Sequence, residues 1–463
     1  MKFLLFGTGD YYQRYKKWFT REEIVALLDN SAYKQNTIID GYRVLAPEEG
    51  IELSYDAIII LSFYFKDMKE QLISLGVLAE QIYHFYDLNS ILNWKKMARP
   101  VQYYGITAEE IRAKEKRRIL LLSQELTLGG PPIALLHAAE ILKANGCEVV
   151  YASMIDGPLR EKLERSGIPV IVDENIQVAT MQDINWTNYF SLIICNTINF
   201  HIFLTKRNMN IPIVWWLHDA PFFYDGIRQE NLERINDKNM AIVSVGPVPM
   251  NAMRRYLPSV SIGRLLYGVE DVAIPRSNSI DDDRKITFVT IGFWENIKGQ
   301  DILLRAVELL SDEIKNAMEV LFVGHDSTLF AEELKGKHKS LAGIHYLGSV
   351  DREQIHNILS RADVLVCPSR QDSMPTVVAE AMMHSVPCIV SDAIGTVEYI
   401  ESGKDGLIFR SEDVKELSDK IEWCVKHKPE IAFMGNDSRR IYEEVFSMKA
   451  FERDLLSVVE KFI

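Results

Sequence analysis

The sequence has few cysteines and no long apolar segment. Its 463 residues include five cysteines, an odd number without clustered spacing, so we expect neither a disulfide framework nor a zinc site. No run approaches the roughly 20 apolar residues that cross a bilayer, and the start of the chain, residues 1–6, meets glycine and Asp10 too early for a signal peptide. We therefore expect reduced thiols and a cytoplasmic protein.

Basic residues are also in the minority. The 52 lysines and arginines against 65 acidic residues give a formal charge of −13, which argues against a nucleic-acid binder because that function needs a basic face. Internal repeats and low-complexity tracts are absent from the sequence. The length predicts roughly three domains of about 150 residues each, and the sequence does not indicate an oligomeric state.

Short apolar runs, separated by helical or polar stretches, recur along the whole chain. This alternation predicts an α/β protein with mainly parallel sheets. We expect strands at 2–6, 24–28, 56–61 and 81–85, then at 118–123, 147–152, 168–172, 192–195, 211–217 and 241–245, and finally at 286–291, 319–324, 344–348, 362–367 and 386–391.

The most informative stretch lies between residues 367 and 400. A strand ends at Cys367, a polar loop follows, and the apolar spacing after Pro375 predicts a short helix. The loop therefore lies at the carboxyl end of a parallel strand, where open α/β sheets bind ligands. Free amides at the helix start suit a phosphate. Glu380 lies about a turn and a half further along and suits a ribose, while Asp372 is in the loop. Taken alone, Glu380 is better explained as a solvent-facing residue and Asp372 as a turn-forming residue.

Together these residues resemble the donor-site motif of the retaining family 4 glycosyltransferases, which have the GT-B fold. The matching segments are Pro368-Ser369, Asp372-Ser-Met-Pro375, Glu380-Ala-Met382, Ser385-Val-Pro387 and Ile394-Gly395-Thr-Val-Glu398. The family's Glu-x7-Glu pair is present with Asp first, and its glycine-rich parts are partly substituted. The resemblance implies two Rossmann-like domains facing a cleft. It also implies a nucleotide diphosphate sugar as donor, which we expect to be a UDP-sugar, with no cofactor and no metal.

The resemblance also implies roles for individual residues. His218, at the end of a strand, and Asp372 would contact the sugar, Lys298 the diphosphate, and Glu380 the ribose. The remaining positions expected to bind the donor are Ser373, Met374, Pro375, Thr376, Gly129, Gly130, Gly292 and Gly395. The acceptor would be a glycan, a glycolipid or a glycoprotein in bacterial surface polysaccharide or glycoconjugate synthesis.

The sequence departs from the family pattern at a phosphate-binding arginine. Phe293 and Ile297 stand where the family has that arginine, and Arg370 is a candidate substitute. The loss motivates an alternative hypothesis, in which the chain is a catalytically weak GT-B partner that binds and stabilises another glycosyltransferase. The acidic run 281–283 is interpreted as a solvated loop between domains and not as a metal site.

The first module has part of a dinucleotide-binding pattern. Gly7-Thr-Gly9 follows the first strand, and Asp29 comes twenty positions after Gly9, but Tyr12 stands in place of the third glycine. The aromatic residues between 11 and 19 predict a packed helix. The module resembles the small Rossmann-like domains that precede bacterial sugar acyltransferases. Nucleotide binding, with a sensing role, and a docking role both stay open.

These observations predict five parts of the chain. The linker is rich in lysine and arginine, so it is either a solvated helix or an anchor on anionic lipid at the inner face of the membrane. The parts are an accessory module (1–90), the linker (91–117), an acceptor-side domain (118–272), a nucleotide-sugar-binding domain (273–440) and a final helix crossing back to the acceptor side (441–463).

Overall fold

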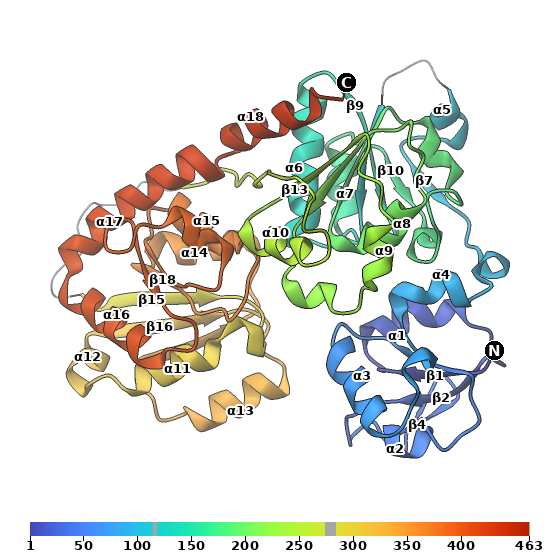
Figure 1. Ribbon diagram of the computed structural model, residues 1–463. Helices are drawn as coiled ribbons and strands as arrows, with labels where there is room; N and C mark the ends of the chain where they lie inside the picture. Colours follow the sequence, from blue (N-terminus) through green and yellow to red (C-terminus); the bar gives the residue numbers. More distant parts are fainter. Residues whose placement is uncertain (114–117, 274–283, 463) are drawn as a thin grey trace. The chain divides into compact units, whose positions relative to one another are not determined.

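Three parallel-rich sheets form the framework of the computed structural model, which describes residues 1–113, 118–273 and 284–462 (Figure 1). The predicted acidic run 281–283 and the basic residues at 114, 116 and 117 lie outside these ranges. Contacts group the chain into two units. Unit 1 holds 1–242, 251–262 and 462–463, and unit 2 holds 243–250 and 263–461.

The first sheet belongs to the N-terminal module and has the order β3-β4-β2-β1-β5-β6. Its strands are β1 (Phe3–Phe6), β2 (Ile24–Leu28), β3 (Ile38–Ile39), β4 (Tyr42–Leu45), β5 (Ala57–Ile60) and β6 (Ile82–His84), with helices α1 (Asp10–Tyr15), α2 (Pro47–Gly50), α3 (Phe65–Ser74) and α4 (Leu88–Ile91). All pairs but the β3–β4 hairpin are parallel. The predicted aromatic helix is shorter than expected and continues as a 3-10 turn (Lys16–Trp18), but its aromatic packing is confirmed because Tyr12, Tyr15, Trp18 and Phe19 are buried.

The second sheet has the order β14-β13-β12-β11-β8-β9-β10-β7. Its strands are β7 (Gln102–Tyr104), β8 (Arg118–Ser123), β9 (Glu148–Ser153), β10 (Val170–Val172), β11 (Leu192–Asn196), β12 (Ile213–Leu217), β13 (Met240–Ser244) and β14 (Ile262–Arg264). Its helices are α5 (Ala108–Arg112), α6 (Gly130–Ala144), α7 (Leu159–Arg165), α8 (His201–Thr205), α9 (Gln229–Glu233) and α10 (Pro247–Arg254). β7 runs antiparallel to β10 at the edge, while β8 lies between β9 and β11 and is parallel to both.

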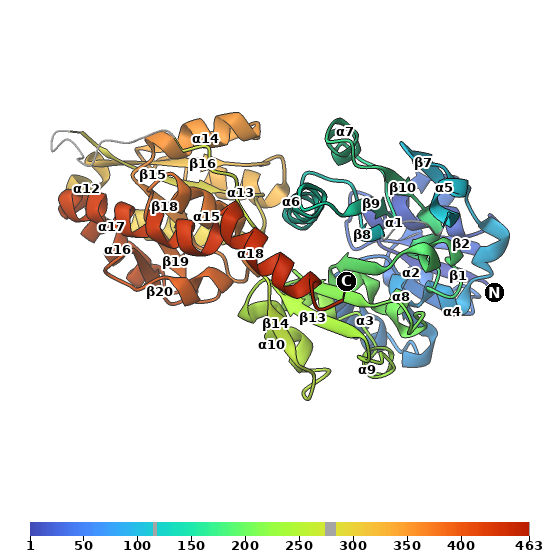
Figure 2. The ribbon, with the colours of Figure 1, turned by 90° about the horizontal axis from the view of Figure 1, so that it is seen from above.

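The third sheet is parallel throughout and has the order β17-β16-β15-β18-β19-β20. Its strands are β15 (Ile286–Ile291), β16 (Met318–Val323), β17 (Ile344–Gly348), β18 (Val364–Cys367), β19 (Cys388–Ser391) and β20 (Gly406–Phe409). Helices α11 (Gln300–Glu308), α12 (Asp312–Asn316), α13 (Leu329–Lys337) and α16 (Val414–Lys426) cover one face, and α14 (Arg352–Arg361), α15 (Thr376–Met383) and α17 (Lys428–Ile441) cover the other (Figures 1 and 2).

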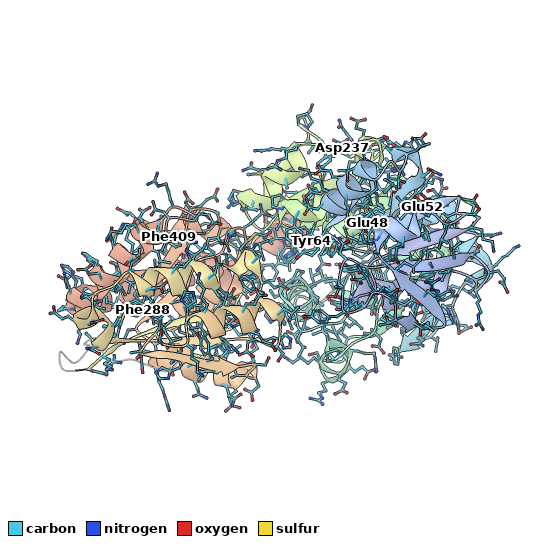
Figure 3. All side chains as sticks on the ribbon, turned by 90° about the horizontal axis from the view of Figure 1, so that it is seen from below. Glu48, Glu52, Tyr64, Asp237, Phe288 and Phe409 are labelled. Carbon is cyan, nitrogen blue, oxygen red and sulfur yellow. The ribbon has the colours of Figure 1, made fainter. Side chains whose placement is uncertain are left out.

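The core of the third sheet is apolar on both faces, as the continuous apolar runs of its strands require. Phe288 of β15 and Phe409 of β20, labelled in Figure 3, are buried in it. The α/β class predicted from the sequence is thereby confirmed. Within the described ranges no helix is both long and apolar enough to span a bilayer.

The predicted final helix is interrupted. α17 ends at Ile441, a π-helical turn follows at Tyr442–Phe446, and α18 begins anew at Met448 and runs to Val459. Ser447 has extended backbone angles, and its hydroxyl accepts a hydrogen bond from the Ala450 amide at 3.2 Å, as a helix N-cap does. The helix predicted from residue 441 therefore starts as a π-helical turn and continues as α18 after Ser447.

Candidate active site

The third sheet has a topological switch point between β15 and β18. The chain leaves β15 toward β16 and leaves β18 toward β19, in opposite directions along the sheet. The loops after these two strands therefore separate and leave a crevice at their carboxyl ends, the usual ligand site of such sheets. A pocket opens at this place, lined by Thr290, Ile291, Lys298, Gln300, Cys367, Pro368, Ser369, Asp372, Pro375 and Val377.

Lys298 and Asp372 form an ion pair in this pocket. The Lys298 Nζ atom lies 2.6 Å from Asp372 Oδ2, and the charge of Asp372 raises the pKa of the lysine, whose side chain is partly buried. The loop of Lys298 is held against the loop of Asp372 by Gly299, whose φ of 70° favours glycine and where a Cβ would lie 2.1 Å from the Pro368 carbonyl oxygen. The fold thus presents a fixed ammonium group, as a diphosphate site requires.

The start of α15 lies beside this pair. Pro375 is its N-cap, and the amides of Thr376 and Val377 belong to the first turn, where the helix supplies no carbonyl partner. The preceding residues are held by the loop after β19, because the Gly395 amide donates to the Asp372 carbonyl at 3.1 Å. A Cβ on Gly395 would lie 1.9 Å from the Ser373 carbonyl oxygen, and the Tyr267 hydroxyl donates to the Met374 carbonyl at 3.1 Å.

Glu380 lies one turn into α15 and is 4% exposed. Its Oε1 accepts a hydrogen bond of 2.6 Å from the Arg352 guanidinium, which belongs to α14 and is half exposed. A buried carboxylate without a cation would be costly, so the arginine compensates the charge of Glu380. Asp351 and Gln354 form a capping box at the start of α14. The sequence gave no indication of the Arg352 contact, because it joins two separate helices.

Gly292 and Arg370 were both expected to contribute to donor binding, and the structure gives them different surroundings. Gly292 follows β15, and a Cβ on Gly324 of the adjoining loop would lie 2.0 Å from its carbonyl oxygen. Arg370 was expected to replace the missing phosphate-binding arginine. The structure instead places its guanidinium on both oxygens of Asp301, at 2.8 Å each, and on Glu412. Since its donors are occupied, Arg370 ties loops together beside the pocket.

The other predicted residues lie at the carboxyl edge of the second sheet, in unit 1. His218 follows β12; its Nε2 is buried and has no hydrogen-bond partner within the described structure. Burial lowers the pKa of His218 to about 3, so the imidazole is neutral at ordinary pH. Burial raises the pKa of its neighbour Asp219 to about 7, and Asp219 Oδ2 accepts from the Ile198 amide at 2.6 Å.

Gly129 and Gly130, which were expected to bind the donor, lie at the start of α6. Gly129 is the N-cap, and Pro131 and Pro132 occupy the following turn. Proline has no amide hydrogen, so this helix start offers fewer donors to an anion than the start of α15 does. The two glycines suit close approach of a ligand better than anion binding.

Comparison with known proteins bears on what these sites do. Residues 284–427 match the family described as glycosyl transferases group 1, and residues 115–245 match the description glycosyl-transferase family 4. The chain belongs to the family 4 glycosyltransferases. Residues 1–83 match a third description, C2185-like, N-terminal. The family 4 part of this chain is thus preceded by an additional α/β domain, as the sequence resemblance predicted.

Curated relatives include the spore coat protein SA of Bacillus subtilis, 26% identical over 364 residues, which are 72% of this chain and 95% of that protein. An N,N'-diacetylbacillosaminyl-diphospho-undecaprenol alpha-1,3-N-acetylgalactosaminyltransferase of Campylobacter jejuni is 30% identical over 31% of this chain and 36% of its own length. Among solved structures, Anabaena HepE in complex with UDP-glucose superposes with a TM-score of 0.62 at 18% identity, over 74% of this chain and all but 1% of that chain. WaaG, involved in lipopolysaccharide biosynthesis, gives 0.58 at 12% identity. The GT-B fold predicted for this family 4 glycosyltransferase is confirmed.

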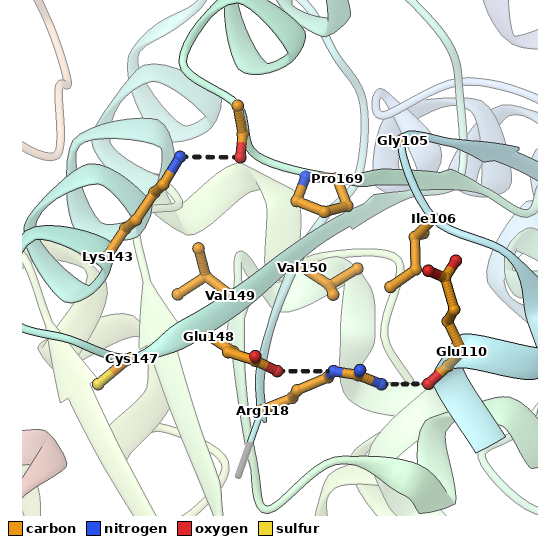
Figure 4. A pocket seen from close by; sticks show the side chains of 11 residues that line it. Gly105, Ile106, Glu110, Arg118, Lys143, Cys147, Glu148, Val149, Val150 and Pro169 are labelled. Atoms are coloured by element: carbon orange, nitrogen blue, oxygen red, sulfur yellow. Dashed lines mark hydrogen bonds and ion pairs between the residues drawn. The ribbon is translucent and has the colours of Figure 1, made fainter. Parts of the chain in front are cut away.

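A second pocket of this glycosyltransferase lies at the opposite, amino edge of the second sheet (Figure 4). Arg118 and Glu148, at the starts of β8 and β9, pair at 3.0 Å, and the Lys143 Nζ donates to the carbonyls of Ser166 and Gly167 at 2.6 and 2.8 Å. Arg118 and Lys143 are thus engaged by neighbouring groups of the protein, and we assign no ligand to this pocket.

Proposed function

We propose that this glycosyltransferase moves a sugar from a UDP-sugar to a glycan or a lipid-linked acceptor, with retention of configuration. The observation that carries the proposal is the Lys298–Asp372 pair beside the start of α15, with Glu380 behind it, at the switch point of the third sheet. One cation, free amides and a buried carboxylate match the charges of a diphosphate and the hydroxyls of a ribose.

In this proposal each group has one task. Lys298 and the amides of Thr376 and Val377 bind the diphosphate, Glu380 accepts the ribose hydroxyls, and Asp372 and His218 contact the sugar. The acceptor hydroxyl attacks the anomeric carbon on the face from which the nucleotide departs. The new carbon–oxygen bond forms as the bond to the phosphate breaks, and the acceptor's proton passes to the departing phosphate oxygen. Stabilising that phosphate is the protein's main contribution.

The choice of donor and acceptor draws on the relatives. HepE is known in complex with UDP-glucose, the Campylobacter enzyme is named for a diphospho-undecaprenol acceptor, and a Staphylococcus aureus relative is named for capsular polysaccharide biosynthesis. Surface polysaccharide or glycoconjugate synthesis is therefore the setting we propose. The domain limits at 90, 117, 272 and 440, a cytoplasmic location and a lipid contact of the linker stay predictions.

The test is UDP release from UDP-glucose, UDP-galactose, UDP-N-acetylglucosamine and UDP-N-acetylgalactosamine by wild type and Glu380→Ala. Glu353→Ala is the matched control, because Glu353 is an exposed acid in the neighbouring helix. We expect release from at least one donor by wild type and by the control, and its loss in Glu380→Ala. UDP release by all three proteins at the same rate would contradict the proposal.

A second candidate function is that of a weakly active partner of another transferase. Among the described residues that line the pocket, Lys298 is the single cation, and Arg370 is engaged elsewhere. Absence of a melting-temperature shift with UDP, GDP or dTDP and with their sugars would favour this function over transfer.

A further inference from the structure

The carboxyl edge of the N-terminal module resembles a nucleotide site in sequence, but its acidic residue is already engaged. Asp29 Oδ2 accepts hydrogen bonds from the amide of Thr8, at 3.1 Å, and from the Thr8 hydroxyl. Asp29 Oδ1 accepts from the Ser31 amide at 2.9 Å, and Lys34 lies 3.3 Å away. A carboxylate with these partners stabilises the glycine turn and has little capacity left for a ribose.

Aromatic side chains cover the same edge. Tyr11, at the start of α1, stacks on Phe85 with ring centroids 4.8 Å apart and meets Phe63 edge to face at 4.7 Å. Phe63 follows β5 and Phe85 follows β6, so these rings occupy the ends of the strands around the module's own switch point between β1 and β5. The place where a nucleotide would bind is filled by the protein.

Contacts with three connections of the second sheet join this edge to the carboxyl edge of that sheet. Arg14 pairs with Glu125, in the loop after β8, at 2.9 Å. The Tyr86 hydroxyl donates to Asn199 Oδ1, in the segment after β11. Phe63 packs edge to face on Phe223, in the segment after β12, with centroids 4.5 Å apart. Figure 1 shows α1 and α4 on the side of the module that faces the second sheet.

The segment that Tyr86 contacts also positions Asp219. The Asn199 side chain donates to Gln124 and to the Thr197 hydroxyl, and the Ile198 amide donates to Asp219 at 2.6 Å. Thr197 has a φ of 74°, which is strained for a β-branched residue. Such a backbone persists only when neighbouring groups hold it, and Tyr86 binds two residues away.

We propose that the N-terminal module is a support for the acceptor-side loops, in which Tyr86 and Phe63 are positioning residues for His218 and Asp219. Tyr86 holds the 197–199 segment through Asn199, and Phe63 holds the 221–224 segment through Phe223. This inference rests on the proposed function, in which His218 contacts the donor sugar. It excludes nucleotide sensing as the module's task.

Two variants of the full chain test the proposal. Tyr86→Phe removes one oxygen and keeps the ring contact with His201, whose centroid lies 4.8 Å away. Phe63→Ala removes the contact with Phe223. The matched controls are Tyr64→Ala, since Tyr64 is 73% exposed and adjoins Phe63 (Figure 3), and Lys17→Ala, which breaks an ion pair of 2.9 Å with Glu174 between the same two domains.

Hydrogen–deuterium exchange is the readout that does not depend on activity. We expect both variants to speed amide exchange at 197–199 and 219–224 by roughly fivefold or more, since a held segment opens more often when a contact is lost. The controls should leave exchange at these residues at the wild-type rate. Wild-type exchange in Tyr86→Phe and Phe63→Ala, at wild-type melting temperature, would overturn the proposal.

Kinetics with the UDP-sugar that wild type uses are the second readout. We expect kcat for UDP release to fall roughly tenfold in both variants, because misplacement of a contact group by less than 1 Å is costly, while the Kd for UDP stays unchanged. Loss of UDP affinity parallel to kcat, or an equal loss in the controls, would overturn the positioning role. If wild type releases no UDP from any donor, the proposed function fails and the exchange comparison alone decides on the support role.

Discussion

The N-terminal module and the third sheet share a sequence pattern but differ in the contacts of their acidic residue. Each has a parallel sheet with a switch point, a glycine turn after the first strand and an acid placed for a ribose. In the module, Asp29 is bound by Thr8, Ser31 and Lys34. In the third sheet, Glu380 has a single cation on one oxygen. Under the proposed function, the comparison teaches that unused hydrogen-bonding capacity, more than the motif, separates a ligand site from a structural turn.

The largest expected effect tests this comparison directly. We expect Glu380→Ala to weaken UDP binding by about 100-fold or more, because two hydrogen bonds to a charged group contribute about 1.5–3 kcal/mol each. Asp29→Ala should leave the Kd for UDP unchanged and lower the free energy of unfolding of the module by about 1–3 kcal/mol. Isothermal titration and chemical denaturation measure the two effects. Equal loss of UDP affinity in both variants would refute the distinction.

The next largest effect concerns the buried acid of the second sheet. Burial raises the pKa of Asp219 to about 7, so the folded protein binds a proton that the unfolded chain has lost above pH 4. Stability from this group is therefore present at low pH and lost as pH rises toward 7, on the order of 2–3 kcal/mol between pH 5 and 7.

Asp219→Asn should remove this pH dependence. Its melting temperature relative to wild type should rise from pH 5 to pH 8. The lowered pKa of His218 removes stability as pH falls below about 6.5. This effect is common to both proteins and cancels in the difference between their melting temperatures. A constant difference across this range would show that Asp219 is ionised throughout.

A smaller effect is expected at the pocket's lysine. Lys298→Ala should weaken UDP binding roughly tenfold and leave uridine binding unchanged, since the ammonium group acts on the diphosphate. Lys285→Ala, at an exposed lysine of the same domain, is the control. Titration with both ligands measures the difference, and equal loss for UDP and uridine would place Lys298 elsewhere in the site.

The smallest effect sharpens the account of Glu380. The Arg352 guanidinium occupies Oε1 of that carboxylate, so a ribose must displace it or use the other oxygen. We expect Arg352→Ala to bind UDP about threefold more tightly and to melt at a lower temperature without ligand, because a buried charge is left unpaired. Arg361→Ala, at the exposed end of α14, is the control. Weaker UDP binding would show that Arg352 itself contacts the nucleotide.

Local patterns predicted most of the framework. The strands 24–28, 118–123, 286–291 and 344–348 have the predicted bounds, because a buried parallel strand is a continuous apolar run bounded by turn residues. The strands at 38–39, 42–45, 102–104, 262–264 and 406–409 were missed, and all of them except 42–45 lie at a sheet edge. They are short or partly exposed, so their apolar pattern is weak.

The contacts that decide which sites are free could not be predicted. Arg352 and Glu380 are 28 positions apart, Arg370 and Asp301 are 69 apart, and Tyr86 and Asn199 are 113 apart. Pairs at such separations depend on how helices and loops pack against each other. The periodicity of a single sequence carries no information on that packing. Most of the predicted donor-site residues could be identified from the sequence, because the loop and the helix that carry them are adjacent in sequence.

The module's edge-to-edge contact with the second sheet has a consequence for inheritance. Glu125, Asn199, Phe223 and Arg228 face module side chains from three separate connections, those after β8, β11 and β12 of the second sheet. A recombination event that moved residues 1–92 alone onto another transferase would leave those four positions without counterparts. We therefore expect relatives to inherit the module together with the segments that it contacts. Chimaeras that join the module to a transferase without these segments should give less soluble protein.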